Sequence, residues 1–376
     1  MASLPFAKPN ELGLDNARFE AACERIRSWT TGPESPMPGA ALLVARHGKM
    51  IEPRFFGKQG PEPDAPPIRR NAIFLLASIT KPVVYLAAMK LVERGLLCLS
   101  DKVTRYLPDF AAHHKEEILI SHLFTHTSGL PDMLPNNTEL RKAHAPLEEF
   151  TRAAIRDTVP LFAPGTRLSY QSMGTLVVSE IIQKISGQSI NAFLKQELFD
   201  PLRLKSTALG SKGLDADRIV RVQVPEYQAG SDYGWNSAYW RELGAPWGGM
   251  FSTPEDFAAI CQLMLGQGKF GDQRLFAPGT IKMITTNRLD DYPDLPEGVR
   301  RTQPWGLGWR MNHMGLPGSW GDLLGRHTYG HFGATGTMFW IDPETQGFCL
   351  MFTSMEHSRG HWRFVEISNL VASAFM

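Results

Sequence analysis

Short apolar segments near both ends of the chain have the pattern of β-hairpins. At the N-terminal end, residues 39–44 and 49–56 are largely apolar and flank the turn residues His47-Gly48. At the C-terminal end, residues 336–341 and 348–352 flank a polar turn. Apolar runs of this length, bounded by turn-forming residues, are typical of paired strands. We therefore expect one hairpin from each end of the chain.

Helical spacing of apolar residues predominates elsewhere. Residues 15–29 place apolar side chains on one helical face behind a cap at Asp15 or Asn16, and residues 363–375 predict a terminal helix. Residues 96–289 mostly follow the same period and are interrupted by loops rich in Pro and Gly.

These elements predict an α/β fold of the α+β type. It has an antiparallel β-sheet built from both termini and flanked by helices, with an inserted, mostly α-helical domain. In residue numbers, 1–95 and 300–376 would form the sheet domain and 96–299 the helical domain.

Charge composition argues against partners that bind through electrostatics alone. The 376 residues include 39 Lys+Arg and 38 Asp+Glu, which gives a formal net charge of +1. Nucleic acids and anionic lipids are attracted by an excess of positive charge, which this chain lacks. We therefore expect no nucleic-acid partner and a small-molecule substrate instead.

The start of the sequence lacks the basic residues and the apolar run of ~7–15 residues that mark a secretory signal. No stretch approaches the ~20 apolar residues of a membrane span. We expect a cytoplasmic protein with no membrane partner, and the sequence leaves its oligomeric state open. Its four cysteines lie far apart in apolar segments and predict buried thiols: Cys23, Cys98, Cys261 and Cys349. No phosphate-binding loop occurs, so no cofactor is expected.

Residues 76–82 place a serine, a lysine and a proline at the start of an apolar helical pattern. Proline is tolerated in the first turn of a helix, so Pro82 puts the helix start at about Ser78. Residues three apart share a helix face, and Lys81 can therefore reach the Ser78 hydroxyl and influence its proton. On spacing alone, a helix cap beside a solvated lysine explains the pair better than a catalytic role does. The apolar neighbours, however, would bury part of Lys81, and a buried lysine requires a reason.

Two further segments offer groups that such a pair needs. A tyrosine at position 170 precedes an apolar helix, and near a charged Lys81 its phenolate would be favoured, making Tyr170 a candidate general base. Residues 329–336 are rich in glycine, so their backbone could approach a ligand and offer an N–H to an oxyanion. Considered alone, Tyr170 is explained equally well by a packed ring as by a catalytic role. His331, considered alone, is better explained as an ordinary strand residue than as a functional one.

Taken in order, Ser78-x-x-Lys81, Tyr170-x-Ser172 and His331-x-Gly333 resemble the three motifs of the serine β-lactamase and penicillin-binding-protein superfamily. The resemblance is closest to its class C-like branch. That branch holds class C β-lactamases, D-Ala-D-Ala carboxypeptidases, D-aminopeptidases and family VIII carboxylesterases. Segments 120–131 and 248–257 also resemble stretches of this family, and the similarity runs from about Asp15 to the C-terminus.

The resemblance implies a β-lactamase/transpeptidase-like fold with the active site in the cleft between the two domains. Ser78 would be the nucleophile that accepts the acyl group, with Tyr170 and Lys81 as the proton-handling pair. The backbone N–H groups of Ser78 and Ala334 would form the oxyanion hole. Which of Lys81 and Tyr170 is the base in acylation stays open. The residues expected to bind substrate are Ser172, His331, Gly333 and Trp247.

Two departures from the family's pattern bear on its activity. Ser172 replaces the asparagine that would grip a lactam or peptide carbonyl. His331 replaces a lysine, and a histidine that is mostly neutral near pH 7 holds a carboxylate less firmly. Both changes weaken recognition of anionic lactams and C-terminal peptides, although His-x-Gly also occurs among peptidases of the superfamily.

We therefore expect a serine hydrolase that acts as a carboxylesterase on small acyl esters. The main alternative is a class C-like β-lactamase, a D-aminopeptidase or a D,D-carboxypeptidase. An acyltransferase, in which an alcohol or amine replaces water, and a non-catalytic binding protein are further alternatives.

Two other features complete the sequence-based expectations. A loop rich in aromatic residues is expected to wall an apolar acyl or alcohol pocket, with Trp235, Tyr239, Trp240 and Trp247. The pairs His122/His126 and His357/His361 have the i,i+4 spacing of metal ligands on helices, but neither has the accompanying glutamate of HExxH. We expect no metal site.

Overall fold

The computed structural model describes residues 4–32, 35–312, 320–357 and 361–376. Its main sheet joins strands from both ends of the chain in the order β2-β1-β12-β11-β10-β9, and β3 also pairs with β1. Every pairing in this sheet is antiparallel. The strands are β1 (Gly39–Arg46), β2 (Lys49–Met50), β3 (Arg54–Gly57), β9 (Arg310–Met311), β10 (Tyr329–Gly333), β11 (Thr337–Asp342) and β12 (Gly347–Thr353). The expected fold class is confirmed.

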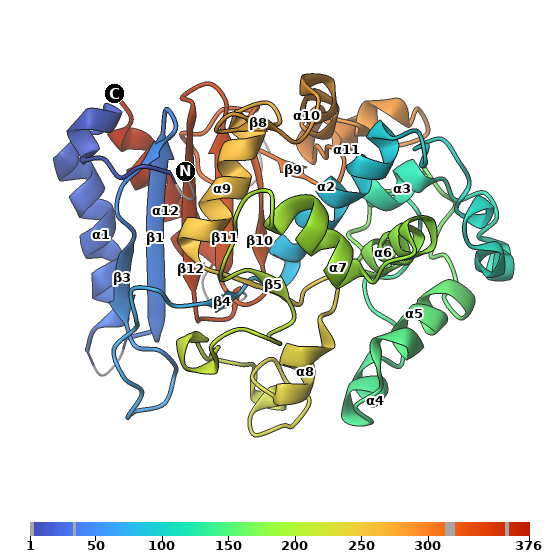
Figure 1. The fold of residues 1–376 in the computed structure, drawn as a ribbon, viewed down its shortest axis with the longest axis horizontal. Helices are drawn as coiled ribbons and strands as arrows, with labels where there is room; N and C mark the ends of the chain where they lie inside the picture. Colours follow the sequence, from blue (N-terminus) through green and yellow to red (C-terminus); the bar gives the residue numbers. More distant parts are fainter. Residues whose placement is uncertain (1–3, 33–34, 313–319, 358–360) are drawn as a thin grey trace.

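Helices cover both faces of this sheet. On one face lie α1 (Asn16–Thr30) and α12 (His361–Ala374), and on the other lies α9 (Pro254–Leu265) (Figure 1). Successive residues of a strand point to opposite faces, so Leu42 packs in the core beneath α1 and α12 while Leu43 packs in the larger core on the other side. A strand buried on both faces has few polar positions, which explains the nearly continuous apolar runs in the sequence.

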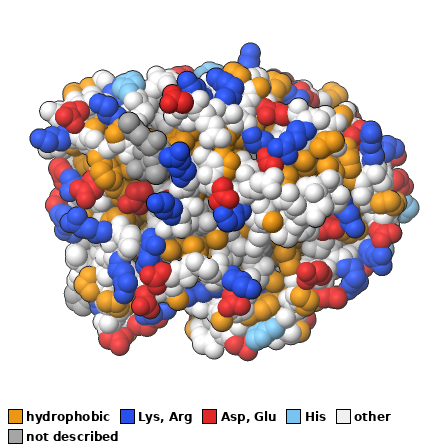
Figure 2. All heavy atoms as spheres, viewed as in Figure 1, with side chains coloured by type: hydrophobic (Ala, Val, Ile, Leu, Met, Phe, Trp, Pro, Cys, Tyr) orange, Lys and Arg blue, Asp and Glu red, His pale blue; other side chains and the backbone are white. Residues whose placement is uncertain are grey.

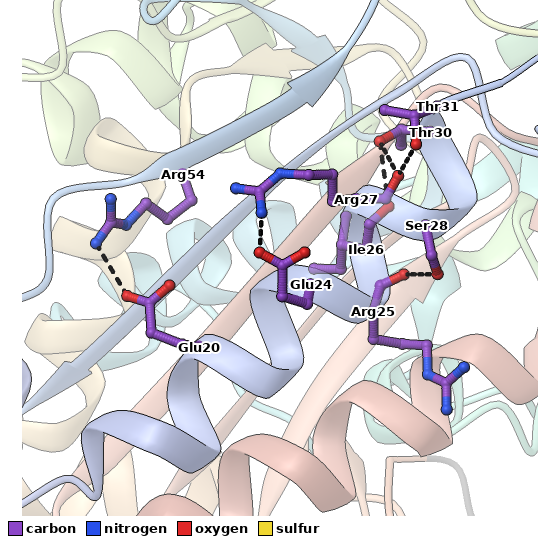
Figure 3. Close-up of polar contacts among 9 residues, drawn as sticks. All are labelled: Glu20, Glu24, Arg25, Ile26, Arg27, Ser28, Thr30, Thr31 and Arg54. Carbon is purple, nitrogen blue, oxygen red and sulfur yellow. Dashed lines mark hydrogen bonds and ion pairs between the residues drawn. The ribbon is translucent and has the colours of Figure 1, made fainter.

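Helix α1 begins as predicted, because the Asp15 carboxylate accepts a hydrogen bond from the Arg18 backbone N–H at 3.0 Å. Figure 3 shows its outer face, where Glu20 forms an ion pair with Arg54 of β3 at 3.4 Å. Exposed ion pairs of this kind contribute at most about 1 kcal/mol. The apolar face of α1, which includes Phe19, therefore supplies most of its attachment to the sheet.

The region between the two hairpins is mostly helical. Its central helices are α2 (Thr80–Glu93) and α6 (Met173–Ser186), and α2 is buried on nearly every side, as expected for a helix with so few polar residues. Around them lie α3 (Ile120–Phe124), α4 (Asn137–Lys142), α5 (Leu147–Arg156), α7 (Ile190–Leu194), α8 (Ala238–Leu243), α10 (Pro278–Ile284) and α11 (Glu297–Thr302). The division of the chain at residues 95 and 300 stays a prediction.

A small antiparallel sheet lies between the main sheet and the helical region. It consists of β4 (Phe74–Leu75), β6 (Met250–Ser252) and β5 (Ala208–Leu209), in the order β4-β6-β5. The sequence did not predict it, because strands of two or three residues are too short to show a period. The remaining strands, β7 (Lys269–Phe270) and β8 (Gln273–Arg274), form a separate pair.

The expectation of four buried thiols is wrong at one position. Cys23, Cys261 and Cys349 are buried, and burial raises the pKa of Cys23 to about 12. Cys98 is exposed, because it lies in the turn after α2 where its neighbour Leu97 takes the buried position instead.

The surface carries charges of both signs. Figure 2 shows Lys and Arg interspersed with Asp and Glu over the face in view, rather than gathered into a patch of one sign. Among the described residues, no helix has both the length and the apolar character needed to cross a membrane.

Candidate active site

Ser78 lies in a 3-10 turn, Ala77–Ile79, that runs directly into α2. The α-helix itself begins at Thr80, slightly later than the sequence predicted, and Pro82 still falls in its first turn. The residue before the serine, Ala77, has a φ of +46°. Such a left-handed conformation is unfavourable for a residue with a side chain and persists only where the surroundings hold it.

Threonine hydroxyls hold the backbone that leads to Ser78. Three successive carbonyls, those of residues 75, 76 and 77, accept hydrogen bonds from Thr335, Thr337 and Thr80 at 2.6, 2.9 and 2.6 Å, respectively. Two of these threonines belong to the β10–β11 turn and strand β11, so the main sheet fixes the position of the nucleophile. No local pattern in the sequence indicates this role for the two threonines.

Gly333 allows strand β10 to pass close to this backbone. A Cβ atom at this position would lie 2.3 Å from the carbonyl oxygen of Leu76 and 3.2 Å from the Cβ of Ala77. Any larger residue would therefore push β10 away from the turn that carries Ser78. The expected binding residue Gly333 thus has a steric explanation in the structure.

Lys81 is the buried partner of Ser78. Its side chain is 1% exposed, and Nζ donates to Ser78 Oγ at 3.0 Å and to the carbonyl oxygen of Trp247 at 2.8 Å. Burial lowers the pKa of Lys81 to about 7, and the nearby Asp132 carboxylate opposes this change. Near neutral pH much of the amine is therefore uncharged and able to accept the Ser78 proton.

Tyr170 lies on the other side of the amine, with its ring centroid 4.8 Å from Lys81 Nζ. Its hydroxyl is buried and forms no well-aligned hydrogen bond with any described residue, although the Ser78 hydroxyl lies close enough to affect its pKa. Burial raises the pKa of Tyr170, and the Ser78 hydroxyl opposes the rise. The expectation of a favoured phenolate is therefore not met, because the cost of burying a phenolate dominates beside an amine that is itself only partly charged. Tyr170 is a phenol that can donate a proton.

His331 is buried beside this pair but carries no charge. Its ring centroid is 5.9 Å from that of Tyr170, and its Nδ1 lies 2.7 Å from the Phe332 carbonyl oxygen and 3.0 Å from the Phe332 nitrogen, so the tautomer decides which of these contacts is a hydrogen bond. Burial, with the positive field of Lys81, lowers the pKa of His331 to about 3. A neutral imidazole occupies this position throughout the physiological pH range.

Ser172 points to a carboxylate that no sequence motif marked. Its hydroxyl donates to Asp132 Oδ1 at 2.6 Å. Asp132 ends the segment Gly129-Leu130-Pro131-Asp132, whose turn residues were the only local signal of its position. The Ser172 hydroxyl is therefore already engaged within the protein.

A cavity of about 180 Å³ opens beside Ser78. Ser78 and Ala334, the two expected oxyanion residues, both line it, and its apolar wall is formed by Trp235, Trp240 and Trp247. The fourth aromatic residue of the loop, Tyr239, does not line this cavity, and its hydroxyl donates to the carbonyl oxygen of Ala145 at 2.8 Å. Lys81, Tyr170 and His331 lie outside the lining of the cavity.

The structure gives the histidines of the first pair other roles. His122 Nδ1 accepts from the Leu119 N–H at 3.0 Å, and His126 Nδ1 accepts from the Gln171 N–H at 3.2 Å. Within the described ranges, no group of three or more His, Cys, Asp or Glu residues could hold a metal ion. The second pair, His357/His361, spans residues 358–360. These residues and the His361 side chain lie outside the described part of the chain.

The sequence as a whole matches the model of one protein family. The β-lactamase family model covers residues 26–366. The chain belongs to the β-lactamase family. Members of its superfamily are serine hydrolases, so the Ser78–Lys81 contact lies in a family whose chemistry depends on an activated serine.

Relatives in the β-lactamase superfamily differ in activity. The chain is 25% identical to a protein from Salmonella enteritidis PT4 named "Putative D-alanyl-D-alanine carboxypeptidase", across 94% of this chain and 87% of that one. Its fold is similar to that of EstCE1, described as a hydrolase with promiscuous acyltransferase activity, with a TM-score of 0.75, 19% identity and coverage of 95% and 98%. A penicillin-binding-protein homologue from Caulobacter crescentus gives a TM-score of 0.75, 21% identity and the same coverage.

Proposed function

We propose that this member of the β-lactamase family is a carboxylesterase that hydrolyses small acyl esters through an acyl-Ser78 intermediate. The observation that carries the proposal is the contact of 3.0 Å between Lys81 Nζ and Ser78 Oγ, made by an amine whose pKa is lowered to about 7. An amine with this pKa is suited to general-base catalysis near neutral pH.

In the proposed acylation step, neutral Lys81 takes the proton of Ser78 while Oγ attacks the ester carbonyl. The negative charge on the carbonyl oxygen develops next to the backbone N–H groups of Ser78 and Ala334. The leaving alkoxide takes the phenolic proton of Tyr170, and Tyr170 regains a proton from Lys81. Water then attacks the acyl-Ser78 ester by the same route in reverse, which releases the acid and restores the serine.

Features of the second and third motifs and of the cavity wall favour an ester over an anionic lactam or a C-terminal peptide. His331 occupies the position where lactamases keep a lysine, and its lowered pKa leaves it uncharged. Ser172 replaces the asparagine of the second motif, and its hydroxyl is bound to Asp132. The three tryptophans of the cavity wall suit an apolar acyl chain. Binding of an ester requires neither the asparagine amide of the second motif nor the lysine cation of the third.

A D,D-carboxypeptidase is the second candidate, because the Salmonella relative that bears this name aligns with 94% of the chain. An acyltransferase is the third, since the fold resembles that of EstCE1. In each case the substrate remains a small molecule that acylates Ser78, and no cofactor takes part in the proposed steps.

Turnover of four chromogenic substrates tests the proposal: p-nitrophenyl acetate, p-nitrophenyl butyrate, nitrocefin and D-alanyl p-nitroanilide. We expect rapid turnover of the esters, and a fall of at least about 10³-fold in Ser78→Ala because the nucleophile is lost. Ser28→Ala, an exposed serine of α1 whose hydroxyl bonds to the Arg25 carbonyl, is the matched control. Preferred cleavage of nitrocefin or of the D-alanyl substrate would replace the esterase proposal with a lactamase or a D-peptidase. A stoichiometric fluorophosphonate label on Ser78 would exclude a non-catalytic protein.

A further inference from the structure

The cavity beside Ser78 contains a cation that forms no ion pair with any carboxylate of the described residues. Arg141 of α4 lines this cavity together with Ser78. Its guanidinium carbon lies 4.2 Å from the ring centroid of Trp240, so the tryptophan wall supports the cation from one side. Arg141 Nε and Nη2 both donate to the carbonyl oxygen of Tyr233, at 3.2 and 2.8 Å.

The described surroundings of Arg141 supply no opposite charge to it. The ionisable groups that act on it electrostatically are tyrosines, a residue type that is uncharged near pH 7: Tyr227, Tyr239 and Tyr233. Over the described residues, no carboxylate forms an ion pair with it. Arg221, on the wall of a neighbouring cavity, is by contrast paired with Glu62 through two contacts of 2.8 and 2.7 Å.

An arginine in this state is suited to a carboxylate ligand. A guanidinium carries five N–H groups in a planar fork, and a single carbonyl oxygen uses only part of that capacity. Arg141 Nη1 makes no hydrogen bond within the described part of the chain. A carboxylate from a bound molecule would supply the missing charge and a matching planar geometry.

The position of the cavity shows which part of an ester it would receive. The leaving alcohol must meet the proton donor Tyr170, which lies outside the cavity lining. Ala334 and Gly248 line the cavity instead, on the side of the expected oxyanion hole. The acyl group therefore extends from Ser78 past the tryptophans, with Arg141 within the same cavity.

We infer that the acyl group of the substrate ends in a carboxylate, which Arg141 binds. The substrate class is then the half-ester of a dicarboxylic acid. This inference rests on the proposed esterase function and names the substrate of the same site. The aromatic wall contacts the methylene chain, the cation holds the free carboxylate, and the ester at the other end meets Ser78.

Two chromogenic esters that differ only in charge test the inference. They are the 4-nitrophenyl half-ester of adipic acid, which is an anion, and its methyl ester, which is neutral. We expect wild-type kcat/KM to favour the half-ester, and Arg141→Met to lower kcat/KM for the half-ester by about 10- to 100-fold. The methyl ester should change by less than about threefold, because Met keeps an apolar stem beside Trp240. Arg141→Lys should give an intermediate loss, since it retains charge without the fork.

Lys142→Met is the matched control. Lys142 is the neighbouring exposed residue of the same short helix, and its loss removes the same charge without changing the cavity lining. Preference for the half-ester should survive in Lys142→Met. Equal losses in both variants would mean that general electrostatic attraction, rather than binding by Arg141, selects the anion, and would overturn the inference.

Failure of the inference is distinguishable from failure of the esterase proposal. Equal turnover of both esters, unchanged in Arg141→Met, would overturn the inference and leave the esterase proposal standing. If neither ester is hydrolysed, calorimetric binding of adipate to the folded protein still tests Arg141, because binding requires no turnover. We expect the affinity for adipate to fall at least about tenfold in Arg141→Met, and an unchanged affinity would contradict the inference. Thermal unfolding of each variant checks that it is folded.

Discussion

Lys81 and Lys115 are both almost completely buried, yet the hydrogen bonds of their amines differ. Each ammonium lies over an aromatic ring, Lys81 at 4.8 Å from the centroid of Tyr170 and Lys115 at 5.0 Å from that of Phe110. Burial lowers the pKa of both side chains, to about 7 for Lys81 and about 8 for Lys115. By burial and pKa alone, the two sites would be hard to tell apart.

Hydrogen bonding separates them. Lys115 Nζ donates to the Ile155 carbonyl, the Thr158 carbonyl and the Thr158 hydroxyl, at 2.7, 2.9 and 3.1 Å. These acceptors use all three protons and satisfy carbonyls that the end of α5 leaves unpaired. Lys81 has only two acceptors among the described residues, and one of them is the hydroxyl of the partly exposed Ser78. A lowered pKa therefore indicates function only where the amine can exchange its proton with a reacting group.

The sharpest test of this comparison is to replace each lysine with methionine. We expect Lys81→Met to lower kcat/KM for p-nitrophenyl butyrate by about 10²- to 10⁴-fold, because the general base is lost. Lys115→Met should stay within about threefold of wild type once the folded fraction is accounted for. Comparable losses in the two variants would show that the distinction drawn from their hydrogen bonds is wrong.

Stability should respond in the opposite order. Lys115→Met removes the donor to two carbonyls and to the Thr158 hydroxyl, which keeps its own bond to the Ala154 carbonyl. We expect the free energy of unfolding to fall by about 2 kcal/mol after partial compensation from removing a buried charge. Lys81→Met should lose less, since Ser78 Oγ can hydrogen-bond to water instead. Urea unfolding monitored by circular dichroism measures both, and equal m-values would confirm that the same cooperative unit unfolds. A larger loss in Lys81→Met would contradict the expectation.

The pH dependence of activity should follow Lys81. Its protonated form has no lone pair to accept the Ser78 proton, so kcat/KM should rise about tenfold per pH unit below about pH 7 and level off above it. The Asp132 carboxylate raises the pKa of Lys81, so Asp132→Asn should move the midpoint to lower pH, whereas Lys115→Met should leave it in place. A rate that falls as pH rises through 7 would instead make the ammonium the active form and Tyr170 the base.

Local pattern was sufficient to predict much of the fold. The hairpins at both ends and the long helices follow from apolar period, because the sheet is covered on both faces and α2 is buried on nearly every side. The strands β4, β5 and β6 were missed, since two or three residues show no period. The contact of Ser78 with Lys81 was also predictable from local sequence, because residues three apart share a face at the start of a helix.

The remaining features of the candidate site depend on segments that are distant in the sequence. The raised pKa of Tyr170 reflects burial among side chains from other elements, which no local motif encodes. Asp132 and Arg141 acquire meaning only through what they face, the Ser172 hydroxyl and the cavity beside Ser78. The exposure of Cys98 likewise depends on how the turn after α2 packs.

The pairing of β1 with β12 has a consequence for how the protein is made. Strand β1 lies at the N-terminal end of the sequence, yet Ala40 is paired with Thr353 and Arg46 with Gly347. During translation, the apolar β1 leaves the ribosome long before its partner has been synthesised, while the helical region between them can already begin to collapse. Contacts so far apart in sequence form slowly and leave unpaired strand edges exposed to aggregation. Yield in an expression host should therefore depend on chaperones that shield β1 until β12 emerges.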